Sequence, residues 1–141
     1  MSPFARYLYD LRMARQIRQC DLAEMLGYDQ SYVSALEVGL KSPPPKEFVE
    51  RLINALSLPP EDALRARQEA DASQRRLVLD VQMPEDVYRL VHALRGRVTR
   101  LQPKQINMIC DILEMSDGMP ARQPEPGRRI PRRKSSQEAP M

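Results

Sequence analysis

The stretch "LAEMLGYDQSYVSALEVG", from Leu22 to Gly39, carries an outward face of unusual composition. Its apolar residues recur at helical spacing, which predicts two short helices separated by Gly27 and one buried side. The side chains left facing outward are Gln30, Ser31, Ser34 and Ala35. A solvated helix face is usually made of charged residues, whereas these four are small or uncharged. Because Gln and Ser both donate and accept hydrogen bonds, such a face suits the base edges of a major groove.

The alternative for Gln30 and Ser31 is a merely solvated helix face. The neighbouring residues favour the first interpretation. Gly27 can end one helix in the left-handed conformation, and Asp29 is a suitable N-cap for a second helix over 30–38, closed by Gly39. A helix, a glycine turn and a second capped helix form a helix-turn-helix arrangement, whose second helix enters the major groove.

Three more helices are predicted around this pair. Ser2 can cap a first helix that begins at Pro3, a fourth helix follows the prolines at 43–45, and a fifth lies in 59–70. After residue 72 the pattern changes. Residues 76–81 alternate as in a short strand, although a helix is also compatible with them. Residues 84–101 and 102–115 then predict two amphipathic helices, an αα-hairpin.

We therefore predict an all-α fold, in which the hairpin is preceded either by a short strand or by more helix. Residues 1–72 form a five-helix domain, residues 73–118 a small region that pairs two subunits, and residues 119–141 a disordered basic tail. From Ala121 onward the tail has six Lys or Arg and two Glu. These arginines are either plain solvated charge or a flexible arm that contacts phosphates.

The first half of the chain resembles the Cro/cI-type (XRE-like) helix-turn-helix family, whose fold is that of the lambda-repressor domain. The features that carry the resemblance are Arg12, Ile17, Gln19 before "DLA", Gly27, "QSYVS", Glu37, Gly39 and a Pro-led fourth helix ending in "NALSL". They lie between about Arg6 and Leu58. The resemblance implies a sequence-specific DNA-binding protein without catalysis or cofactor.

The resemblance also implies residue roles. The recognition helix contacts bases through Gln30, Ser31, Ser34 and Ala35. Phosphates are contacted by Gln19, Tyr32 and Lys41, and Gln19 also braces Gln30. For Tyr32 a partly packed aromatic ring is the alternative.

A structural ion pair between Arg12 and Glu37 is a further implication of the resemblance. Independently, Glu37 lies at a helix C-terminus, where an anion is unfavourable and a cationic partner is needed. The chain departs from the family at Arg18, where a Ser or Thr cap is common. Val38 and Leu40, like Ala35, replace polar or basic residues, which reduces the number of phosphate contacts.

The sequence gives little support for a disulfide, a metal site, a catalytic domain or a membrane span. Cys20 and Cys110 are far apart and each lies in a helical pattern, so we expect two buried thiols rather than a disulfide or a metal site. His92 has no second ligand at metal-binding spacing. The roughly 60 residues after the first domain cannot supply a self-cleaving Ser/Lys domain. No apolar run reaches the length of a membrane span and no signal core is present, so we expect a cytoplasmic, nucleoid-associated protein of bacterial or phage origin without membrane contact.

The leading hypothesis is a transcription repressor that binds double-stranded DNA as a homodimer on a palindromic operator. Its dimer interface is expected between about Arg76 and Met115, because two helices cannot bury all the apolar residues found there. The alternative is an antitoxin or anti-activator that holds a partner protein through the hairpin or the tail.

Overall fold

The computed structural model describes residues 1–115 and residue 118, and regular structure in these residues is entirely helical. The all-α prediction is confirmed. The helices are α1 (Pro3–Ala14), α2 (Gln19–Leu26), α3 (Gln30–Glu37), α4 (Lys46–Ala55), α5 (Pro60–Ala72), α6 (Glu85–Arg97), the 3₁₀ turn η1 (Val98–Arg100) and α7 (Pro103–Met115). The predicted disordered tail, 119–141, lies outside the described residues.

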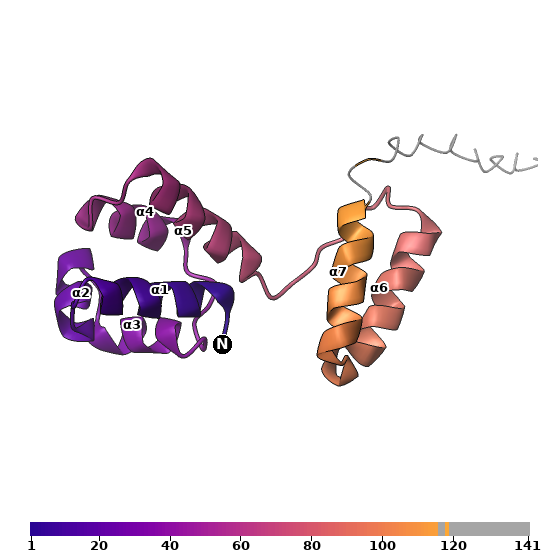
Figure 1. The fold of residues 1–141 in the computed structure, drawn as a ribbon, viewed down its shortest axis with the longest axis horizontal. Coiled ribbons are helices and arrows are strands. Elements are labelled where there is room, and N and C mark those ends of the chain that lie inside the picture. The colour runs from indigo at the N-terminus through magenta and orange to yellow at the C-terminus, as the bar shows by residue number, and fades with distance from the viewer. Residues whose placement is uncertain (116–117, 119–141) are drawn as a thin grey trace, which may run out of the picture. The chain divides into compact units, whose positions relative to one another are not determined.

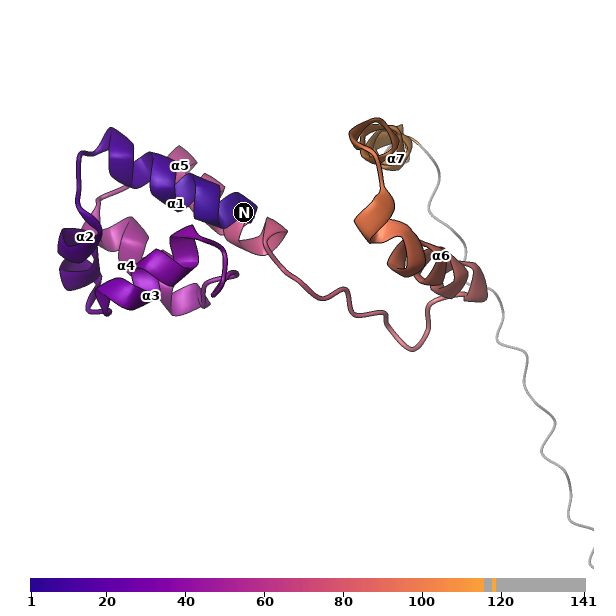
Figure 2. The same ribbon diagram turned by 90° about the horizontal axis from the view of Figure 1, so that it is seen from below.

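The chain separates into two compact units, residues 1–82 and residues 83–141. The first unit contains α1 to α5, with α1 beside α3 and α5, and α2 beside α4 (Figures 1 and 2). Its core is formed by side chains from these five helices. The largest fully buried ones are Phe4, Leu8, Leu22, Val33, Leu36, Phe48 and Leu52. Each helix is amphipathic and buries one stripe, so this unit has a hydrophobic core of its own.

The start of α1 and the end of α2 are fixed by local hydrogen bonds. The Ser2 hydroxyl accepts a hydrogen bond from the Ala5 amide at 3.1 Å and caps α1. At the end of α2, Gly27 has a φ of 72°, and the next amide, that of Tyr28, donates to the Ala23 carbonyl at 3.0 Å. A side chain at Gly27 would be strained in this left-handed conformation, so glycine sets the angle between α2 and α3.

The end of α5 is tied to the start of α1 by a buried serine. The Ser73 hydroxyl accepts a hydrogen bond from the Phe4 amide at 2.9 Å and donates one to the Glu69 carbonyl at 2.7 Å. Ser73 is 5% exposed. It satisfies an amide in the first turn of α1, which has no partner within its own helix. The compact first unit thus extends beyond residue 72.

The strand predicted over residues 76–81 is not formed. Residues 74–80 have no regular secondary structure, and the side chains of Leu77, Val78 and Val81 are exposed. A strand needs a neighbour that completes its ladder of backbone hydrogen bonds, and a single copy of this segment has none among the described residues.

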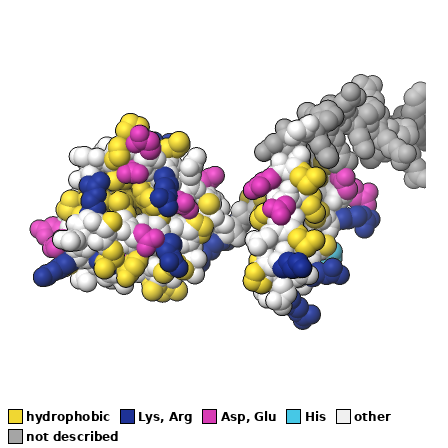
Figure 3. Space-filling model, viewed as in Figure 1, with side chains coloured by type: hydrophobic (Ala, Val, Ile, Leu, Met, Phe, Trp, Pro, Cys, Tyr) yellow, Lys and Arg dark blue, Asp and Glu magenta, His cyan; other side chains and the backbone are white. Residues whose placement is uncertain are grey.

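The second unit, as far as the structure describes it, consists of α6, η1 and α7. None of the residues in these three elements is buried. Figure 3 shows apolar side chains along the visible face of this unit. The prediction of two buried thiols is wrong, since Cys20 and Cys110 are both exposed. Both cysteines lie in helices, as expected, but at positions that face solvent.

Candidate nucleic-acid interface

The outward face of α3 has the composition that the sequence indicated. Val33 and Leu36 are fully buried and anchor the helix in the core. Gln30 and Ser31, in the first turn, are exposed, while Ser34 and Ala35, one turn later, are half-buried. The exposed face continues to Val38, which is 61% exposed. The amide and hydroxyl groups of its first turn are thus presented to solvent at the N-terminal end of the helix.

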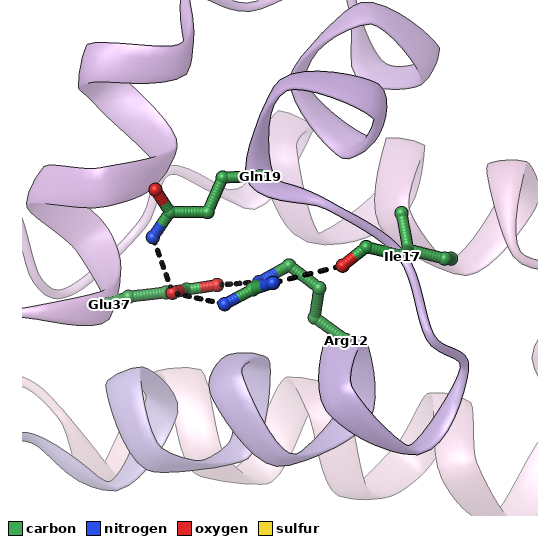
Figure 4. Close-up of polar contacts among 4 residues, drawn as sticks. All are labelled: Arg12, Ile17, Gln19 and Glu37. Carbon is green, nitrogen blue, oxygen red and sulfur yellow. Dashed lines mark hydrogen bonds and ion pairs between the residues drawn. The ribbon is translucent and has the colours of Figure 1, made fainter.

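The opposite end of α3 is held by an ion pair. Arg12 donates from Nε to Glu37 Oε1 at 2.6 Å and from Nη2 to Oε2 at 3.2 Å (Figure 4). The same guanidinium donates from Nη1 to the Ile17 carbonyl at 2.9 Å. Gln19 donates from Nε2 to Glu37 Oε2 at 2.7 Å. This network, formed by Arg12, Ile17, Gln19 and Glu37, links the end of α1, the α1–α2 loop, the start of α2 and the end of α3.

The network explains how a carboxylate is tolerated at this position. The side chain of Glu37 is 6% exposed and that of Arg12 is 12% exposed. Glu37 is the last residue of α3, where the helix dipole disfavours an anion, so the bidentate guanidinium supplies the compensating charge. The hydrogen bond to Glu37 raises the pKa of Arg12 above its usual value. The orientation of α3 is therefore coupled to α1 and α2 through three side chains.

The start of α3 rests on an aromatic cluster. The rings of Tyr28 and Tyr32 are stacked with centroids 5.1 Å apart, and Phe48 meets the Tyr32 ring edge-on at 5.8 Å. Arg51 lies over the Tyr28 ring, 5.4 Å from its centroid, and donates to the Leu26 carbonyl at 3.1 Å. The residues of the turn between α2 and α3 are thereby packed against α4.

The loop after α3 folds back on the helix. Gly39 has a φ of 87°, and the Lys41 amide donates to the Ala35 carbonyl at 3.3 Å. Arg75, beyond the end of α5, donates to the Gly39 carbonyl. Lys41 itself is exposed, and so are the apolar side chains of Val38 and Leu40 beside it.

The three predicted phosphate-contacting residues have different surroundings. Lys41 is exposed, Tyr32 is half-buried in the aromatic cluster, and burial raises the pKa of its hydroxyl. Gln19 is half-buried and uses one N–H in its bond to Glu37. The amide of Gln19 is thus turned toward Glu37 (Figure 4).

Two positioning residues were missed by reasoning from the sequence. Arg51 had a visible signal in its spacing from Glu47, with which it pairs at 2.7 Å, but nothing in the sequence linked it to the Leu26 carbonyl. Arg75 lies in a segment without helical periodicity, and only the folded chain brings it to Gly39.

The part of the chain that the structure describes holds no group of three or more His, Cys, Asp or Glu side chains that could bind a metal ion. Its helices include none that is both long and apolar enough to cross a membrane.

Comparison with known proteins gives a match within the first unit. A family model described as "Helix-turn-helix domain" matches residues 3–67. No curated protein matches the sequence. Among solved structures, one chain from a structure described as a SinR protein/SinI protein complex is similar, with 18% sequence identity and a TM-score of 0.40. The match covers 81% of this chain and 97% of the other.

Proposed function

We propose that this protein, whose residues 3–67 match a helix-turn-helix domain model, is a DNA-binding transcription regulator of the Cro/cI type and acts as a repressor. It binds a palindromic operator as a homodimer, with α3 of each subunit in the major groove of one half-site. The proposal places the protein on the nucleoid in the cytoplasm.

The observation that carries the proposal is the uncharged exposed face of α3 together with its rigid support. Gln30 and Ser31 present hydrogen-bonding groups in the first turn of the helix, where recognition helices reach base edges. The network around Glu37 and the aromatic cluster around Tyr32 hold both ends of the same helix. A helix held at both ends presents its side chains to the groove at a fixed angle.

Roles for the flanking residues follow from this placement. Lys41 is exposed just beyond α3 and contacts a phosphate as a point charge. Gln19 retains a second N–H, beyond the one that bonds Glu37, for a phosphate at the start of α2. The Tyr32 hydroxyl contacts a phosphate while its ring packs on Phe48. Ser34 and Ala35 contact bases one turn after Gln30, and the Ala35 methyl group suits a thymine methyl.

The test begins with selection of bound sequences from random double-stranded DNA. The selected site should contain two inverted half-sites about one helical turn apart. Gln30→Ala should lose discrimination at one base pair of each half-site, an adenine in the simplest case, at a cost of about 1–3 kcal/mol. The matched control is Gln68→Ala, which removes an exposed glutamine from α5.

Lys41→Ala should instead weaken binding to all sequences alike and reduce the salt slope by about one unit. Unchanged relative affinities of Gln30→Ala across operator variants would contradict the base-contacting role. The repressor assignment requires that a reporter placed behind the selected operator becomes less active when the protein is present. Higher reporter activity would make the protein an activator.

Support for a homodimer comes from the second unit and from the segment before it. The apolar residues between about Arg76 and Met115 remain in solvent in a single copy, and pairing of two copies would cover them. A partner protein is the competing occupant of the same surface. Sedimentation of the purified protein distinguishes the two, because a monomer at micromolar concentration would favour the partner protein.

A further inference from the structure

The exposed apolar face of the second unit has chemically different ends. Its apolar residues include Leu90, Leu94, Ile106, Ile109, Ile112 and Leu113, each at least 37% exposed. Helices of this length are marginal in water unless an apolar face is packed. Since no residue of α6, η1 or α7 is buried in a single copy, a second surface that covers this face would stabilise them.

The charged residues of this unit are segregated along its length. The chain runs down α6, turns at η1 and returns along α7, so the residues around η1 form one end, the turn pole (Figure 1). The turn pole carries Arg95, Arg97, Arg100 and Lys104. The other end, the open pole, carries Glu85, Asp86 and Glu114. Figure 3 shows acidic side chains toward the open pole and basic side chains toward the turn pole, with apolar side chains between them.

The residues between the poles do not cancel this arrangement. Arg89 bonds Glu85 of the open pole at 2.6 Å, and Asp111, toward the end of α7, adds a further carboxylate to the half of the hairpin that holds this pole. The turn pole has no acidic residue between Arg95 and Lys104. The unit therefore has a positive end and a negative end on either side of an apolar surface.

We infer that the occupant of this surface is the same unit of a second copy in antiparallel orientation. A two-fold axis perpendicular to the long direction of the hairpin places each turn pole against the partner's open pole. The attraction between the basic turn pole and the acidic open pole then occurs at two symmetric contacts, and the apolar faces meet between these contacts. A two-fold axis along the hairpin would instead place four basic residues against the same four, which is repulsive. This inference rests on the proposed homodimer and adds its orientation.

The orientation can be tested by exchanging charges between the poles. In the full-length chain, Arg95→Glu/Arg97→Glu/Lys104→Glu leaves the turn pole with three acidic residues and one basic residue, which reverses its charge. Asp86→Lys/Glu114→Lys leaves the open pole with two basic residues beside Glu85, which reverses its charge as well. Each of these variants should dimerise about tenfold more weakly than the wild type at low salt, because every change acts at two symmetric contacts. The variant with all five changes should dimerise more tightly than either of them, because its two poles again have opposite charges. Sedimentation gives the affinities, and circular dichroism verifies that helix content is kept.

Mixing the five-change variant with the wild type separates the two orientations. In the antiparallel dimer the mixed pair has like charges at both contacts, so the two proteins should self-sort into homodimers. In a parallel dimer the mixed pair has opposite charges at both ends and would form preferentially. The control Arg6→Glu/Arg18→Glu/Lys46→Glu changes the net charge as the turn-pole variant does, but on exposed residues of the first unit, and should leave dimerisation unchanged.

The outcomes separate the inference from the proposed function. A wild-type monomer at micromolar concentration overturns the homodimer and the orientation together. A wild-type dimer that prefers to pair with the five-change variant overturns the orientation alone. Dimerisation that none of the pole changes affects also overturns it, because the poles would then not meet.

Discussion

The two units of this protein differ in where their apolar side chains are covered. In residues 1–82, seven large side chains are almost completely shielded from solvent by five helices of the same chain. In α6 and α7 the helices are as long as α1 and α5, yet no residue is buried. Amphipathic helices are thus present in both units, and the number of helices that can surround a core makes the difference. The first unit buries a core in one copy, whereas the described part of the second unit does not.

The largest effect is expected from the ion pair inside the first unit. Arg12→Met or Glu37→Gln should lower the free energy of unfolding by about 3–5 kcal/mol, because each change leaves a poorly solvated partner without its hydrogen bonds. The double variant should lose less than the sum of the two. Urea unfolding of the four proteins measures this coupling. Strict additivity would show that the two side chains do not stabilise each other.

An exposed ion pair in the same unit is the matched control. Arg67 and Glu50 meet at 2.8 Å, but their side chains are 50% and 37% exposed. Arg67→Met or Glu50→Gln should therefore change the free energy of unfolding far less than the changes at Arg12 and Glu37 do, because solvent screens the exposed pair. An effect as large as that at Glu37 would mean that burial does not determine the strength of these pairs.

The second prediction compares the same substitution in both units. Leu22→Ala removes a fully buried side chain and should lower the free energy of unfolding of the first unit by about 3 kcal/mol, at every protein concentration. Leu90, which is 63% exposed, should behave differently. Leu90→Ala should weaken dimerisation and leave the unfolding of the first unit unchanged. Unfolding curves at two protein concentrations distinguish the cases, and a concentration-independent loss for Leu90→Ala would contradict the comparison.

Much of the first unit could be predicted from the sequence, because its signals are local. The periodicity of Val33 and Leu36, the left-handed glycine at Gly27 and the cap at Ser2 act within a few residues. The outward face of α3 follows from the same periodicity. The ion pair of Arg12 with Glu37 depended on resemblance, since 25 positions separate the two residues.

The remaining features depend on contacts that no local pattern encodes. The bond from Gln19 to Glu37 and the approach of Arg51 to the Leu26 carbonyl arise only when α2, α3 and α4 are assembled. Over residues 76–81 the local pattern was instead misleading. The alternation predicts a strand, but a strand also needs a neighbouring strand, which the pattern does not supply.

The third prediction concerns the serine that closes the first unit. Ser73→Ala should lower its free energy of unfolding by about 1–2 kcal/mol, since the Phe4 amide then remains buried without a partner. Gln74→Ala, at the exposed next position, is the control and should have little effect. A chain that ends at residue 72 should show at least the same loss relative to one that ends at residue 82. Equal stability of the two truncated chains would show that Ser73 contributes nothing to closure.

The smallest effect is expected from pH, and it too should be confined to the first unit. Burial raises the pKa of the Tyr7 hydroxyl, which donates to the Asp62 carbonyl at 3.3 Å, and burial also raises the pKa of Tyr32. In the unfolded chain these hydroxyls ionise near pH 10, so above that pH the folded state holds protons that the unfolded state has released. The ionisation of these two hydroxyls should therefore leave the free energy of unfolding constant below pH 10 and decrease it above pH 10. Unfolding measured between pH 8 and pH 11 should show a shallower decrease for Tyr7→Phe/Tyr32→Phe than for the wild type. An equally steep decrease in both proteins would show that the two buried hydroxyls are not its cause.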